Sequence, residues 1–176
     1  MAGPVLSIEG LKIEFARPQG ALVAVNDVSF DVRPGEILGL VGESGAGKSI
    51  IGSAIMGLLD PPGRIGGGAI SLKGERIDGL PEPLFRRIRG KRIGMIFQDP
   101  MTSLNPLFTV GEQLIRTMTT HLDISRSAAR ERALALMHDV GIVAPEKRID
   151  QYPHQFSGGM RQRIVVTLAL CAEPEI

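Results

Sequence analysis

Residues 42 to 49 read Gly42-Glu43-Ser44-Gly45-Ala46-Gly47-Lys48-Ser49 and decide the expected fold. A glycine, four residues and then Gly-Lys-Ser form the pattern of a phosphate-binding loop, which lies between a strand and a helix. Its glycines let the backbone wrap closely, so that successive N–H groups and the following helix N-terminus face phosphate oxygens. We expect Lys48 to neutralise the β- and γ-phosphates, Ser49 to bind Mg²⁺ and Ile50 to complete the nucleotide contacts. The alternative is a glycine-rich turn that binds nothing.

The sequence on both sides of this loop predicts the strand and the helix that the pattern requires. Ile37 to Val41 is a short apolar run, typical of a strand buried on both faces. Ile50 to Leu59 has apolar residues at helical spacing, and Asp60-Pro61-Pro62-Gly63 is expected to end the helix. This order fits any of several nucleotide-binding classes, including small-molecule kinases and GTPases.

More strands are predicted before and after this segment. Apolar and polar residues alternate over Val5 to Phe15 and over Val23 to Val32, as in half-buried strands. A hairpin is expected around Gly74, after a flexible connector at Gly66-Gly67-Gly68. Arg92 to Phe97 is predicted to form another buried strand.

The last part of the chain, from about Pro100, is predicted to be helical. Glu112 completes a capping box at the first of three helix starts, and Gly141 is expected to end the second helix. The three starts are residues whose hydroxyls can cap a first turn: Thr109, Ser125 and Ser157.

Composition and charge narrow the classes of function. Lys and Arg number 20 against 19 Asp and Glu, a net charge of +1, so the total does not favour a nucleic-acid partner. The basic run Arg86 to Arg92 lacks interleaved aromatic residues, and we interpret it as a solvated face. The single cysteine, Cys171, cannot form an internal disulfide. No stretch approaches the ~20 apolar residues that span a bilayer, so we expect a cytosolic protein unless a membrane partner holds it.

A second motif selects one class of nucleotide-binding protein. Phe156-Ser157-Gly158-Gly159-Met160-Arg161-Gln162-Arg163 resembles the signature of ABC ATPases, with Met160 at the place of the usual glutamine. A serine and two glycines at a helix start present a hydroxyl and free N–H groups to an anion. A plain N-cap would explain Ser157, but not two glycines that each cost ~1 kcal/mol in a helix. The resemblance implies that Ser157, Gly158, Gly159 and Met160 close over the γ-phosphate held by a partner subunit.

Two further residues take their roles from the same resemblance. Met95-Ile96-Phe97-Gln98-Asp99-Pro100 is similar to the family's Q-loop. The resemblance implies that Gln98 reaches Mg²⁺ and the attacking water, although a lone glutamine at a strand end is usually only solvated. Phe15 falls where the family places an aromatic ring beneath the adenine, while a strand phenylalanine is otherwise a core residue.

Longer strings resemble one subfamily, the ATPases of oligopeptide, dipeptide and nickel importers. The strings are Gln98 to Pro106 and Tyr152 to Arg163. Ile50 and Met160 are further residues typical of that subfamily. The resemblance implies ATP and Mg²⁺ as cofactors. It also implies a second ATPase subunit, two permease subunits and a substrate-binding protein as partners, on the cytoplasmic face of the inner membrane.

The resemblance also implies parts that residues 1–176 do not contain. ABC ATPases continue into an apolar strand that ends in Asp-Glu and later carry a switch histidine, whereas this sequence stops near Pro174, where that strand is expected to begin. We therefore expect a chain that is truncated before the Walker B strand. The Asp and Glu anchor Mg²⁺ and polarise water, so binding and hydrolysis are judged separately.

The expected fold is α/β, a P-loop NTPase of ABC type with the C-terminal part of its core missing. An antiparallel β-subdomain is expected at about 1–35 and 66–80, a P-loop core at 36–60 and 91–99, and a helical subdomain with the signature at 100–176. The expected function is the ATP-binding subunit of a peptide importer, incapable of hydrolysis as residues 1–176 alone. The alternatives are a soluble ABC ATPase without a membrane partner, or the remnant of a disrupted transporter gene.

Overall fold

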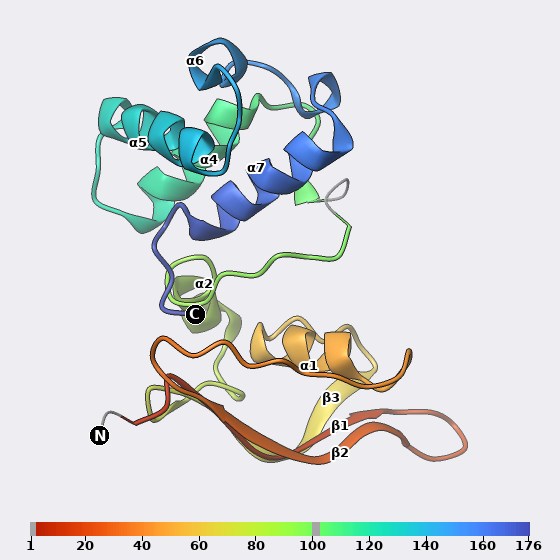
Figure 1. Ribbon diagram of the computed structural model, residues 1–176. Helices are drawn as coiled ribbons and strands as arrows, with labels where there is room; N and C mark the ends of the chain where they lie inside the picture. The colour runs from red at the N-terminus through yellow and green to blue at the C-terminus, as the bar shows by residue number, and fades with distance from the viewer. Residues whose placement is uncertain (1–2, 100–102) are drawn as a thin grey trace. The chain divides into compact units, whose positions relative to one another are not determined.

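The computed structural model describes residues 3–99 and 103–176. The chain divides into two compact units, residues 1–86 with Ile176 and residues 87–175, and their boundary falls inside helix α2 (Glu82–Ile88) (Figure 1). The first unit holds the sheet and the second is helical, which confirms the expected α/β architecture of an antiparallel sheet and a helical part. The boundaries given above for the three subdomains stay predictions.

The sheet has four antiparallel strands in the order β2-β1-β3-β4. They are β1 (Leu6–Phe15), β2 (Leu22–Val32), β3 (Gly63–Leu72) and β4 (Glu75–Arg76). Ile13 of β1 lies opposite Val25 of β2 and Ile65 of β3. The alternation of apolar and polar residues therefore predicted β1 and β2 within one residue, and the hairpin at Gly74 is confirmed.

A bulge in β1 corrects the expectation of a flexible Gly66-Gly67-Gly68 connector. Leu6 and Ile8 are buried before the bulge and Leu11 and Ile13 after it, because Gly10, at φ +55°, inserts an extra residue against both neighbours. The glycine run lies inside β3, opposite this bulge. A Cβ on Gly68, at φ +83°, would collide with the carbonyl oxygens of Glu9 and Gly10. The glycines therefore permit close strand pairing.

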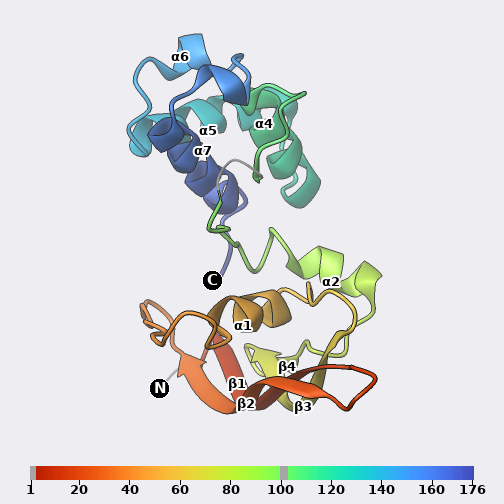
Figure 2. The ribbon, with the colours of Figure 1, turned by 90° about the vertical axis from the view of Figure 1, so that its right-hand side faces the viewer.

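Helix α1 (Lys48–Ile55) lies over one face of the sheet in both ribbon views (Figures 1 and 2). Ile51 and Ala54 are its buried side chains. The helix ends earlier than the expected Leu59, because Gly57 adopts φ +60° and closes a Schellman turn. In that turn the Gly57 N–H donates to Ala54 O at 3.0 Å and the Leu58 N–H donates to Ser53 O at 2.8 Å.

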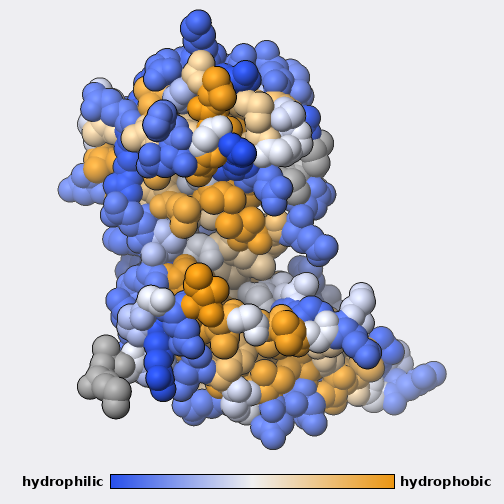
Figure 3. Space-filling model, viewed as in Figure 1, coloured by the Kyte–Doolittle hydropathy of each residue, from blue (hydrophilic) through white to orange (hydrophobic). Residues whose placement is uncertain are grey.

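Two strands predicted from apolar runs do not form, and both predictions were wrong. Residues 37–41 form no strand and have no strand partner among the described residues, and Ile37 and Val41 are 99% and 90% exposed. Residues 92–97 make one isolated bridge, between Arg89 and Ile93. A strand is a paired structure, and an apolar run forms one only where a neighbour supplies backbone partners. In the view of Figure 3, apolar side chains gather on the surface over α1 and over the segment that runs along it.

The helical unit begins its helices at the residues expected to cap them. The Thr109 Oγ1 accepts a hydrogen bond from the Glu112 N–H at 3.2 Å, and the Ser125 Oγ accepts one from the Ala128 N–H at 3.2 Å. The elements are α4 (Val110–His121), α5 (Arg126–Asp139), the one-turn α6 (Pro145–Arg148), the 3-10 turn η1 (Pro153–Gln155) and α7 (Gly158–Leu170). Gly141, at φ +77°, follows the end of α5 as expected.

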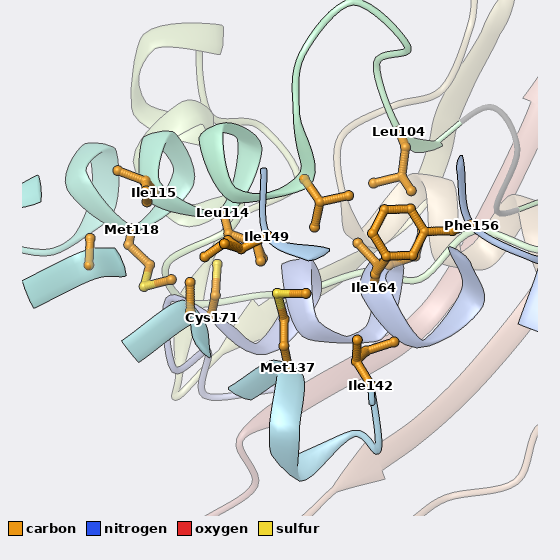
Figure 4. Close-up of a cluster of buried hydrophobic side chains, with 14 residues drawn as sticks. Leu104, Leu114, Ile115, Met118, Met137, Ile142, Ile149, Phe156, Ile164 and Cys171 are labelled. Carbon is orange, nitrogen blue, oxygen red and sulfur yellow. The ribbon is translucent and has the colours of Figure 1, made fainter. Parts of the chain in front are cut away.

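The second unit has its own hydrophobic core (Figure 4). α4, α5 and α7 each contribute buried side chains, among them Leu114, Met137 and Ile164. Phe156, directly before the signature serine, is only 2% exposed and belongs to this core. Among the described residues no helix is long and apolar enough to cross a membrane.

Candidate functional site

The glycine loop of residues 42–47 curls around the side chain of Lys48. The Lys48 Nζ donates hydrogen bonds to Gly42 O at 2.8 Å and to Glu43 O at 2.6 Å. Within the loop, the Ala46 N–H donates to Glu43 O at 3.2 Å. The ammonium group therefore lies against the first two carbonyls of the loop.

Gly47 is the position at which this loop contacts the sheet. Its φ of +86° is in the left-handed region, and a Cβ there would lie 2.8 Å from Val25 Cγ2 and 3.1 Å from Ala24 O. Gly45 has a similar φ of +84°, but a Cβ on it would meet nothing within 4 Å. Gly47 therefore needs both its conformation and its missing side chain, whereas Gly45 needs only its conformation.

The start of α1 has the donors that a phosphate group requires. Gly47 is the N-cap and makes no side-chain hydrogen bond to the first turn, which contains no acidic residue. The first i to i−4 bond is donated by Ile51 to Gly47 O at 3.0 Å. The N–H groups of Lys48, Ser49 and Ile50 precede it, so they have no acceptor in the helix and add to its positive end. This donor set fits an anionic phosphate.

Phe15 lies at the end of β1, in the same unit as the glycine loop. It pairs with Leu22 of β2 and Gly63 of β3, and a Cβ on Gly63 would lie 2.8 Å from Phe15 Cε1. Phe15 is half-buried and lies two positions along β1 from Ile13, whose cross-strand partner Val25 has its Cγ2 2.8 Å from a Cβ placed on Gly47. Phe15 thus lies close along β1 to the strand pair that borders the loop.

Gln98 lies in the unit of residues 87–175, as does the signature. It is an exposed residue in a bend, not the end of a strand as the sequence predicted. Downstream, Ser103 Oγ donates to Asp99 O at 3.0 Å. Pro100, Met101 and Thr102, in the middle of the first subfamily string, lie outside the described residues.

The signature residues form the exposed start of α7. Ser157 is the N-cap, and its Oγ accepts a hydrogen bond from the Met160 N–H at 3.4 Å. Gly158 and Gly159 are exposed, and a Cβ on either would meet nothing within 4 Å. A serine hydroxyl and the first N–H groups of a helix therefore face open space, which suits an approaching anion.

Three other residues singled out in the sequence have structural surroundings. His154 stacks on Tyr152, with ring centroids 5.8 Å apart, and no group of His, Cys, Asp or Glu in the described residues is arranged to hold a metal. Cys171 is fully buried in the core, and this burial raises the pKa of its thiol to about 11, which keeps the thiol protonated near neutral pH. In the basic run, Arg92 pairs with Glu175 at 3.2 Å.

Sequence reasoning missed two residues that support these motifs. No local pattern marks Val25 as the contact of Gly47, because that contact depends on how β2 meets the loop. Arg161 donates from Nε to Phe156 O at 2.9 Å, behind the signature turn. Its signal in the sequence was a positive charge close to a helix N-terminus, where the helix dipole disfavours cations.

Comparisons with known proteins agree on one family. The family model described as ABC transporter matches residues 25–176. The chain is 46% identical over 175 residues to the oligopeptide transport ATP-binding protein OppD of Escherichia coli (strain K12), covering 99% of this chain and 52% of that protein. It is 49% identical over 173 residues to the dipeptide transport ATP-binding protein DppD of Bacillus subtilis (strain 168), covering 98% and 52%. The chain thus spans about half the length of these relatives.

Solved structures support the same fold. The ATP-binding cassette MJ0796, in a dimeric post-hydrolysis state bound to ADP and Pi, has a TM-score of 0.83 at 24% identity and covers 96% of this chain and 70% of that one. CbiO1 from Clostridium perfringens, part of the complex cbiONQ, has a TM-score of 0.74 at 22% identity, covering 98% and 63%. The family model covers most of the chain, from β2 through the glycine loop to the helix that carries Ser157, and by this match the chain belongs to the ABC transporter family.

Proposed function

We propose that this chain is an ATP-binding subunit of an importer of oligopeptides or dipeptides. The observation that carries the proposal is the glycine loop, in which Lys48 lies over the Gly42 and Glu43 carbonyls and α1 begins without a side-chain cap. The choice of peptides rests on the relatives, which are named as oligopeptide and dipeptide transport ATP-binding proteins. Nickel is the alternative substrate that the subfamily resemblance leaves open.

In this proposal residues 42–50 hold the phosphates of ATP. The N–H groups of the loop and of the first turn of α1 donate to phosphate oxygens, and Lys48 neutralises the β- and γ-phosphates. The hydroxyl of Ser49 and the amide of Gln98 would hold Mg²⁺, which supplies neutralisation of the charge on the transferred phosphoryl group. Phe15 would stack beneath the adenine, an interaction worth ~1–3 kcal/mol in nucleic-acid binders.

The signature residues would act on a nucleotide bound by a second subunit. Ser157 and the glycines after it are exposed at the start of α7, so an anion on another chain can reach them. MJ0796 is a dimer in its solved structure, a cassette of the same fold. We infer a dimer of ATP-binding subunits that works at the cytoplasmic face of the inner membrane, with two permease subunits and a substrate-binding protein.

In this proposal, residues 1–176 contain contacts for binding ATP but lack a group needed for its hydrolysis. Residues 42–50 and 157–160 supply contacts to the phosphates, while the sequence of residues 1–176 contains no Asp-Glu pair to polarise the attacking water. We therefore expect residues 1–176 alone to bind ATP but to release phosphate no faster than the Lys48→Ala variant. Steady turnover that depends on Lys48 would contradict this division.

The proposal is tested by uptake of labelled peptides in the source cells. Deleting the gene should abolish uptake of a labelled tri- or tetrapeptide, and the intact gene should restore it, whereas the Lys48→Ala gene should not. Arg130→Ala, a change of a half-buried residue outside both motifs, serves as the matched control and should restore uptake. Normal peptide uptake with lost ⁶³Ni uptake would replace peptide by nickel. Normal uptake of both would favour a soluble ABC ATPase or a gene remnant, and an Asp-Glu strand out of frame in the DNA beyond Ile176 would identify a remnant.

A further inference from the structure

The first turns of α7 contain two arginines that the helix itself does not explain. Arg161 and Arg163 follow the signature glycines, and no acidic residue accompanies them in the first turn. Cations near a helix N-terminus oppose the positive end of its dipole, so their presence weakens the helix slightly. Both side chains lie outside the apolar face that packs into the core through Ile164 and Val165. Neither the helix dipole nor core packing explains the two arginines, which leaves the hydrogen bonds that their side chains make.

Arg161 closes a ring around the signature serine. Its Nε donates to Phe156 O at 2.9 Å, while its own N–H donates to Ser157 O at 2.9 Å. Phe156 is 2% exposed and packs in the hydrophobic core, so the carbonyl that accepts from Arg161 belongs to a core residue. Ser157 is thus held from both sides by one residue of α7.

The side chain of Ser157 makes only a long hydrogen bond within the turn. Its Oγ is 3.4 Å from the Met160 N–H, at the long limit of a hydrogen bond. Gly158 and Gly159 are exposed, a Cβ on either would meet nothing within 4 Å, and glycines have no side chain that would fix the turn. A hydroxyl so loosely held can turn to an external acceptor, provided that the backbone beneath it is fixed by another group.

Arg163 fixes the same helix to its neighbour. Its Nη1 donates to Val140 O at 3.1 Å and to Gly141 O at 2.8 Å, just beyond the end of α5. Gly141 is required there, because it has φ +77° and a Cβ on it would lie 2.5 Å from that Nη1. The cation also complements the negative C-terminal end of α5.

We propose that Arg161 is a positioning residue of the signature motif, which fixes the turn of Ser157 by its hydrogen bond to the Phe156 carbonyl, with Arg163 anchoring the helix behind it. This inference rests on the proposed function, in which Ser157 contacts the nucleotide of a second subunit. Arg161 then acts on turnover and on the order of the turn, but not on the affinity of the glycine loop of its own chain for ATP.

Two substitutions at this position separate the hydrogen bond from the charge. Arg161→Gln places an amide Nε2 the same number of bonds from the backbone as the arginine Nε, so it keeps a donor without the charge. Arg161→Met has similar length and no donor. Arg130→Ala is the matched control, because the Arg130 side chain also donates hydrogen bonds in this unit, to Asp150 at 2.7 and 2.8 Å, but away from the signature.

The experiment uses the full chain as its gene encodes it, assembled with its partner subunits. Arg161→Met should lower ATP turnover about tenfold, which corresponds to ~1.4 kcal/mol, with the KM for ATP within about twofold. Arg161→Gln and Arg130→Ala should stay within about threefold of the parent in turnover. Hydrogen exchange supplies a readout independent of turnover: the amides of Met160 and residue 161, which both donate to Ser157, should exchange about tenfold faster in Arg161→Met alone.

Unchanged turnover and exchange in Arg161→Met would overturn the assignment, as would an Arg161→Gln variant as impaired as Arg161→Met. Ser157→Ala separates a failure of the proposed role of the signature from a failure of the role assigned to Arg161. If Ser157→Ala leaves turnover intact, the proposed role of the signature fails, and the exchange rates still decide whether Arg161 holds the turn. If Ser157→Ala is impaired while Arg161→Met is not, only the role of Arg161 fails.

Discussion

A pair of glycine substitutions in the phosphate-binding loop tests how the loop is supported. Gly45 and Gly47 have nearly the same φ, +84° and +86°, but only Gly47 faces the sheet. An alanine at either position bears the cost of left-handed backbone, ~1–2 kcal/mol. Gly47→Ala must also displace Val25 Cγ2 at 2.8 Å and Ala24 O at 3.1 Å, and overpacking of this kind adds roughly 1–3 kcal/mol.

If the loop must keep this shape to hold phosphate, both costs appear as lost affinity for ATP. Gly45→Ala should weaken binding by about fivefold to thirtyfold, and Gly47→Ala by a further factor of about 5 to 140, at 1.4 kcal/mol per tenfold. Titration calorimetry with ATP on the full-length chain measures both. Adding Val25→Ala to Gly47→Ala should recover part of the loss, because it removes the 2.8 Å contact. Equal affinities for Gly45→Ala and Gly47→Ala would refute the reasoning.

Three further predictions follow from other parts of the chain. Burial, and after it the charge of Lys91, lowers the pKa of His121. The folded state therefore favours the neutral imidazole. Its contribution to the free energy of unfolding is complete above pH ~6.5 and is lost as the pH falls toward the lowered pKa. An NMR titration should give His121 a pKa below 6.5 that rises in Lys91→Ala, and no change would contradict the second cause. Cys171, with its pKa raised to about 11, should resist alkylation at pH 8 in the folded chain and react readily when unfolded; equal rates would mean that it is accessible. Ile37→Lys should leave the stability of residues 1–176 unchanged, because Ile37 is 99% exposed; destabilisation in thermal unfolding would show that Ile37 is packed.

Local chemistry explains which elements could be predicted from the sequence. Thr109, Ser125 and Ser157 cap helices through their own side chains, so four consecutive residues contain each interaction. The alternation in β1 and β2 similarly records which face each residue turns to the core. These elements formed within one or two residues of the prediction.

The failures have a common physical cause, which is dependence on residues distant in sequence. Ile37 to Val41 has the composition of a buried strand, but composition does not supply the backbone partners of a sheet. Gly68 resembles a flexible linker until the Gly10 bulge is placed opposite it. The roles of Phe15, Gln98 and Ser157 were predicted from a resemblance to a family. The approach of Gly47 to Val25 and the hydrogen bond of Arg161 to Phe156 depend on the folded arrangement of the chain, so the sequence alone could not predict them.

The most direct test of the central claim is the affinity of the full-length chain for ATP with and without Lys48. Lys48 is the cation that lies over the glycine loop, with its Nζ 2.8 Å from Gly42 O and 2.6 Å from Glu43 O. A hydrogen bond to a charged group contributes ~1.5–3 kcal/mol, so Lys48→Ala should weaken binding measured by titration calorimetry about tenfold to a hundredfold. Equal ATP affinity for the variant and the parent would contradict the phosphate role of Lys48 and with it the proposed nucleotide site.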